Sequence, residues 1–196
     1  IETLKSELGI SGQDFVYIFI GRQTNFKGFD KVVRAFMLAK QERPNSKLLL
    51  VGEKDRIHPT SLKAKYERAL RTDPSIIKVG WRENVQEYLS LSQLNVFPSE
   101  REGLPVNLME SLAMGVPVLT IDSRGCKEVV RDKVDGRVMK DFSVKALSEE
   151  MIQLQDSPEQ LKAFSKNAIE GRTRFDRKHF VDNQLSIFER LVEKPI

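Results

Sequence analysis

Two glutamates, Glu102 and Glu110, could accept hydrogen bonds from the hydroxyl groups of a ligand. Glu110 lies within residues 106–114, a predicted helix that is apolar almost all round and is therefore expected to be buried. A carboxylate in a buried helix is costly unless a hydrogen-bond donor meets it. Asn107 and Ser111 share its face of the helix, so the three side chains form one polar stripe. The alternative is that Glu110 pairs with a buried arginine or caps a neighbouring helix.

Glu102 lies eight positions before Glu110, in the loop that leads into the predicted helix. Gly103 and Leu104 follow it and offer backbone N–H groups at the positive end of that helix, and Pro105 suits a first helical turn. A nucleotide sugar would use all of these groups. Its ribose and its sugar need hydrogen-bond acceptors, and its diphosphate needs N–H donors and cations.

Two cations and two glycines occupy residues 21–28, GRQTNFKG, just after the first apolar run. The guanidinium of Arg22 can grip phosphate oxygens in a bidentate way, and Lys27 adds a compact charge. Gly21 and Gly28 let a ligand approach the backbone, and the helix that follows adds its positive N-terminal end. The segment therefore suits a diphosphate, although a polar turn with solvated cations would look the same. It contains neither GxGxxG nor GxxxxGK[ST], so dinucleotide and P-loop sites are weakly supported.

Short apolar runs alternate with amphipathic stretches, which predicts a doubly wound, Rossmann-like α/β fold with helices on both faces of a parallel sheet. The predicted strands, about six in number, cover residues 15–20, 47–51, 76–79, 94–97, 116–121 and 136–139. The predicted helices cover residues 30–41, 62–70, 85–91, 106–114, 126–131, 144–154, 158–170 and 177–193. Ligands of such folds bind at the carboxyl ends of the strands, where both segments described above lie. Three parts are expected: a lead-in at 1–14, a ligand-binding domain at 15–175 and a C-terminal helix at 176–196.

Composition excludes several other classes of protein. The 196 residues carry a net charge of +4, from 32 Lys and Arg against 28 Asp and Glu, and no basic stripe is interleaved with aromatics, so nucleic acid is not an expected partner. The single cysteine, Cys126, allows no disulfide within the chain, which fits a reducing cytoplasm. No apolar run approaches the ~20 residues that cross a bilayer. The chain starts with Ile1, as a piece of a longer protein would.

Three segments together resemble the family-four (group 1) glycosyltransferases over about residues 15–139. Glu102, the sequence GLP after it and Glu110 are similar to the E-x7-E signature of that family. Residues 21–28 resemble its phosphate loop, and residues 115–118, GVPV, resemble the strand that follows its signature helix. Residues 123–128, SRGCKE, depart from the Gly-Gly common there and are more similar to enzymes that build bacterial capsule, O-antigen or lipid-linked glycans.

The resemblance implies the donor-binding half of a two-lobed GT-B enzyme that transfers sugar, with retention, from a nucleotide-diphosphate sugar, with UDP the expected nucleotide. Arg22 and Lys27 would hold the diphosphate and Glu110 the ribose, while Glu102 would contact the donor sugar. Catalytic roles are therefore expected for Glu102, Arg22 and Lys27. The expected donor-binding residues are Gly21, Arg22, Lys27, Trp81, Arg82, Glu102, Gly103, Leu104 and Glu110.

The acceptor, a glycan or a polyprenyl-linked glycan, would bind through an N-terminal lobe that the 196 residues lack. The fragment alone would then bind nucleotide without turnover, in the cytoplasm or peripherally at the inner face of the membrane. The sequence has no Asp-x-Asp, so neither a metal nor another cofactor is expected. The alternatives are a nucleotide-sugar epimerase or phosphorylase of the same two-lobed fold, and a non-catalytic α/β binding module.

Overall fold

A computed structural model describes residues 1–55, 57–58 and 60–192 of the chain, and over these residues it forms one parallel sheet of six strands. The strands are β1 Phe15–Ile20, β2 Ser46–Val51, β3 Ile76–Gly80, β4 Leu94–Phe97, β5 Val118–Ile121 and β6 Gly136–Met139. Their order across the sheet is β3-β2-β1-β4-β5-β6, and every neighbouring pair runs parallel. The order reverses between β1 and β4, as in a doubly wound fold. The predicted Rossmann-like fold is confirmed.

The central strands β1, β2, β4 and β5 are mostly apolar and buried, as expected for a parallel sheet covered on both faces. In β1, Tyr17 and Phe19 belong to a core that includes residues of α2 (Phe29–Glu42) and α7 (Val144–Gln155). Val16, Ile18 and Ile20 point the other way, into a second core that includes residues of α4 (Val85–Leu89). This alternation along one strand follows from the two-residue period of side chains in a sheet.

All eight predicted helices are present, with modest shifts at their ends, and the predicted end of the last one, at residue 193, lies outside the described residues. The remaining elements are α1 Glu2–Glu7, α3 Ala64–Thr72, α5 Val106–Ala113, α6 Cys126–Val129, α8 Pro158–Glu170, the 3-10 helix η1 Arg172–Phe175 and α9 Arg177–Val192. Neither α1 nor η1 is predicted from the sequence. β5 begins two residues later than predicted, after Pro117. Proline has no N–H to contribute to a sheet, which accounts for the later start.

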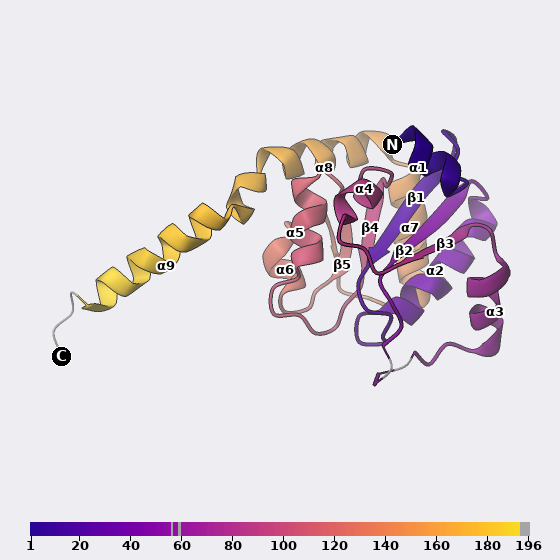
Figure 1. The fold of residues 1–196 in the computed structure, drawn as a ribbon, viewed down its shortest axis with the longest axis horizontal. Helices are drawn as coiled ribbons and strands as arrows, with labels where there is room; N and C mark the ends of the chain where they lie inside the picture. The colour runs from indigo at the N-terminus through magenta and orange to yellow at the C-terminus, as the bar shows by residue number, and fades with distance from the viewer. Residues whose placement is uncertain (56, 59, 193–196) are drawn as a thin grey trace.

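The two ends of the chain differ in how they pack. Leu4 and Leu8 contact the second core, and Ile10 is buried in it. At the other end, α9 has no buried residue and extends away from the body of the domain (Figure 1). The three-part division at residues 15 and 176 stays a prediction.

Glycines bring the loops at the carboxyl edge of the sheet close together. Gly28, which precedes α2, has φ +75°, and a Cβ there would overlap the carbonyl of Pro98 in the loop after β4. Gly52, after β2, has φ +124°, and a Cβ there would overlap the carbonyl of Gly21 in the loop after β1. Any larger residue would push these loops apart, so the glycines fix the distances between the side chains that the loops carry.

Candidate functional site

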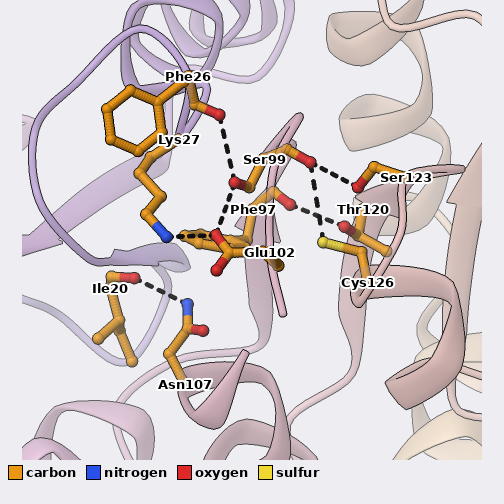
Figure 2. A network of polar contacts seen from close by, with 10 residues as sticks. All are labelled: Ile20, Phe26, Lys27, Phe97, Ser99, Glu102, Asn107, Thr120, Ser123 and Cys126. Atoms are coloured by element: carbon orange, nitrogen blue, oxygen red, sulfur yellow. Dashed lines mark hydrogen bonds and ion pairs between the residues drawn. The ribbon is translucent and has the colours of Figure 1, made fainter. Parts of the chain in front are cut away.

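The loops after β1 and β4 meet in an ion pair between Lys27 and Glu102 (Figure 2). The ammonium nitrogen of Lys27 lies 2.5 Å from Glu102 Oε1, and the two side chains are only 17% and 10% exposed. The ammonium also lies 5.7 Å from the centre of the Phe26 ring and 5.9 Å from that of Phe97. The aromatic faces favour the cation in this partly desolvated place. Two predicted catalytic residues, 75 positions apart, are thus in direct contact.

Glu110 has no such partner. Within the described part of the chain its half-buried carboxylate makes no hydrogen bond or ion pair, so it neither pairs with an arginine nor caps a helix there. Burial raises the pKa of the Glu110 carboxyl above its usual value. Its neighbours on the polar stripe are both satisfied: Asn107 donates to the carbonyl of Ile20 at 2.8 Å, and Ser111 donates to the carbonyl of Val116.

The Asn107 contact places that stripe beside the carboxyl end of β1 (Figure 2). Ile20 is the last residue of β1, and Gly21 and Arg22 follow it directly. Glu110, one helical turn beyond Asn107 on the same face, therefore belongs to the side of the sheet from which Arg22 emerges. The Asn107 contact thus joins α5 to the end of β1, whereas among the described residues no hydrogen bond or ion pair joins Glu110 itself to Arg22.

A cavity of about 460 Å³ opens at the same edge of the sheet. Four predicted donor-binding residues contribute to its lining: Gly21, Arg22, Trp81 and Arg82. The Trp81 indole is 62% exposed and free to stack, whereas Arg82 is held by a 2.8 Å hydrogen bond from its Nε to the Tyr88 hydroxyl. The cavity lies within the volume range of small-molecule sites, and its lining combines the aromatic Trp81 with three cations, Arg22, Lys54 and Arg82.

Arg22 is already paired, to an acid that the sequence did not indicate. Its guanidinium donates to Asp55, in the loop after β2, at 2.7 Å. Hydrogen bonds from the N–H groups of His58 and Ile57 lower the pKa of the Asp55 carboxyl, and Arg22 contributes to the same effect. Asp55 is therefore charged at neutral pH and competes for Arg22 with any anion. Asp55 lies 33 residues after Arg22, and nothing in the sequence predicts that the two side chains meet.

The loop that enters α5 offers donors, although its residues do not all lie at one place. Among the described residues, the N–H groups of Gly103 and Leu104 have no acceptor within the chain. The side chain of Leu104, however, lines a different cavity, of about 510 Å³, together with Met109 and Phe180. The structure thus pairs Glu102 with Lys27 and places Arg22 and Trp81 in the lining of one cavity, whereas Leu104 lines a separate one.

The described residues contain no group of three or more His, Cys, Asp and Glu that could hold a metal ion. They also contain no helix with the length and apolarity to cross a membrane. The expectation that no metal or other cofactor takes part stays a prediction.

The sequence matches the family described as Glycosyl transferases group 1 over residues 1–171. The chain belongs to the group 1 glycosyl transferases. One relative is the N,N'-diacetylbacillosaminyl-diphospho-undecaprenol alpha-1,3-N-acetylgalactosaminyltransferase of Campylobacter jejuni. It is 24% identical over 178 residues, which are 91% of this chain and 45% of the relative.

Two solved structures share the fold of this group 1 chain. Anabaena Alr3699/HepE, solved in complex with UDP, matches with a TM-score of 0.79 and 21% identity over 98% of this chain and 52% of that one. The C-terminal domain of the group 1 protein LpcC from Francisella tularensis matches with a TM-score of 0.74 and 16% identity, over 89% of this chain and 91% of that domain. The chain spans about half the length of the Campylobacter relative and of Anabaena HepE, and its fold is that of one lobe of a GT-B glycosyltransferase.

Proposed function

We propose that this chain is the donor-binding half of a retaining glycosyltransferase that takes its sugar from a UDP-sugar. The observation that carries the proposal is the contact between Lys27 and Glu102, which joins the loops after β1 and β4 at the carboxyl edge of the sheet. A cation for the diphosphate and an acceptor for the sugar hydroxyls thereby lie side by side. The complex of Anabaena HepE with UDP, a protein of the same fold, supports the choice of nucleotide.

The residues divide between three parts of the donor. Arg22 and Lys27 bind the diphosphate, helped by the positive N-terminal end of α2 and by the free N–H groups of Gly103 and Leu104. Glu110 accepts hydrogen bonds from the ribose hydroxyls, and this would supply its missing partners. The exposed Trp81 and the fixed Arg82 form the part of the cavity that takes the base, while Glu102 contacts the donor sugar.

Departure of the nucleotide is the step that these groups assist. As the bond to the anomeric carbon breaks, the sugar takes on oxocarbenium character and negative charge grows on the leaving diphosphate. Cations that are already in place stabilise that charge more in the transition state than in the ground state. Removing one such contact typically costs about 3 kcal/mol of barrier.

The acceptor is a glycan or a lipid-linked glycan, bound by a part of the protein outside these 196 residues. The Campylobacter relative supports this class, because its name describes transfer to a diphospho-undecaprenol-linked sugar. A lipid-linked acceptor would place the whole enzyme at the cytoplasmic face of a membrane, in contact with it peripherally.

Calorimetry with UDP tests the proposal on the chain itself. We expect weak, saturable binding of UDP that is reduced at least tenfold in Glu110→Ala and in Arg22→Ala, since each removes a charge-assisted contact. Ser92→Ala is the control, because Ser92 lies just before β4, at the opposite edge of the sheet, where its hydroxyl donates to the carbonyl of Tyr88 in α4. Equal heats for the wild type and both site variants would overturn the assignment.

A further inference from the structure

The hydroxyl of Ser99 lies between the two loops of the site (Figure 2). Its oxygen is 2.6 Å from Glu102 Oε1 and 3.2 Å from the carbonyl oxygen of Phe26, and the side chain is fully buried. A hydroxyl has a single proton, so it donates to one of these acceptors at a time. The shorter distance and the negative charge both favour Glu102.

The two oxygens of Glu102 are consequently not equivalent. Oε1 accepts from both Lys27 and Ser99, at 2.5 and 2.6 Å. Within the described residues no donor reaches Oε2, which points away from Ser99 (Figure 2). Oε1 is therefore held by hydrogen bonds within the protein, whereas Oε2 can accept a hydrogen bond from a ligand hydroxyl.

We propose that Ser99 is a positioning residue, which fixes the oxygen that Glu102 presents to the donor sugar and holds the carboxylate when Lys27 turns to the diphosphate. The inference rests on the proposed function. Lys27 is shared between Glu102 and any bound phosphate, so its hold on the carboxylate weakens as the donor binds. The Ser99 hydroxyl faces no such competition, since its second acceptor is a backbone carbonyl of its own domain.

The surroundings of Ser99 suit this role because they are rigid. The hydroxyl of Ser123, in the loop after β5, donates to the carbonyl of Ser99 at 2.6 Å. In the same loop Gly125 has φ +84°, and a Cβ there would lie 2.8 Å from Glu102 Cβ. The loop after β5 is therefore packed directly against the Ser99–Glu102 turn, and it limits the rotamers open to both side chains.

The test compares two ligands on the same chain, UDP and UDP-glucose, by calorimetry. Ser99→Ala should weaken UDP-glucose binding by about tenfold, the usual loss for a hydrogen bond to a charged group, and should leave UDP affinity within about twofold. Ser92→Ala is a matched control, since it removes a buried serine hydroxyl at the other end of β4 and should change neither affinity. Ser99→Cys fills the site with a slightly larger side chain whose thiol is only a weak donor, and it should behave like Ser99→Ala, so a poorly folded alanine variant does not block the test.

A double-mutant cycle with Glu102→Ala locates the effect. If Ser99 acts through Glu102, Ser99→Ala adds almost nothing once the carboxylate is gone. Equal losses for UDP and UDP-glucose, no loss for either, or additive effects in the cycle would each overturn the role of Ser99. Failure of the wild-type chain to bind UDP at all would instead remove the proposed function on which that role depends.

Discussion

Glu102 and Glu110 lie eight positions apart and have opposite surroundings. Glu102 accepts from Lys27 and Ser99, and Phe26 and Phe97 flank the cation that neutralises it. Glu110 is half-buried without a donor in the described residues, and burial raises the pKa of its carboxyl. The carboxylate of Glu102 is therefore stabilised by donors within the folded chain, and that of Glu110 is not.

The difference indicates what each position contributes to the protein. A paired carboxylate such as Glu102 is fixed in place before any ligand arrives, as a group that contacts a reacting centre must be. An unpaired, half-buried carboxylate costs stability in the empty protein, because it has lost water without gaining a donor. Such a cost is typical of binding positions, where the ligand supplies the missing partner.

Lys27→Met should show the largest effect, because it would give Glu102 the unpaired state that Glu110 already has. Removing one partner of a buried ion pair leaves an uncompensated charge, so we expect a loss of about 3 kcal/mol in the free energy of unfolding, measured with urea. The double variant Lys27→Met/Glu102→Gln should regain most of that stability, since no charge is left unpaired, while UDP binding stays weak in both. A single variant as stable as the wild type would show that the pair does not hold the two loops together.

Glu110→Gln separates binding from stability at the other carboxylate. UDP affinity should fall by about tenfold to a hundredfold, the range expected when a hydrogen bond to a charged acceptor is lost. The free energy of unfolding should stay the same or rise, because an amide is cheaper than a carboxylate in a half-buried place without donors. A clear loss of stability would instead mean that Glu110 has a structural partner.

The same residue predicts a dependence on pH. Because the pKa of Glu110 is raised in the folded protein, the folded state holds more protons than the unfolded state between the two pKa values. The contribution of Glu110 to stability is therefore most favourable below the unfolded pKa and declines as pH rises through the folded pKa. UDP affinity should change in the opposite sense and increase over that range, as the ionised acceptor appears. Glu110→Gln should remove both trends, and their persistence would assign them to another group.

The sequence predicted the elements of this fold better than the contacts between them. Six apolar runs were sufficient to place the strands, since a buried parallel sheet requires continuous apolar residues, and Pro117 accounts for the one strand that begins late. By contrast, the contact of Asp55 with Arg22 depends on how the loops after β1 and β2 approach each other, which Gly21 and Gly52 determine. Ser99 likewise follows β4 without a motif of its own, and only the folded chain places its hydroxyl against Glu102.

Asp55→Asn should have the smallest effect on UDP affinity and stability. It tests whether Asp55 holds Arg22 in the empty site in the way that Glu102 holds Lys27. The Asp55 side chain is only 8% exposed, but the Arg22 side chain is 61% exposed and stays in contact with water without its partner, so the melting temperature should hardly change. The amide oxygen of asparagine can still accept from the N–H groups of Ile57 and His58, which Asp55 Oδ1 accepts from now. With its competitor removed, Arg22 should bind UDP about two- to threefold more tightly at low salt, and the gain should shrink as added salt screens the charges. Weaker UDP binding in this variant would mean that Asp55 itself contacts the ligand, and Arg22 would then differ from Lys27 in how the empty site holds it.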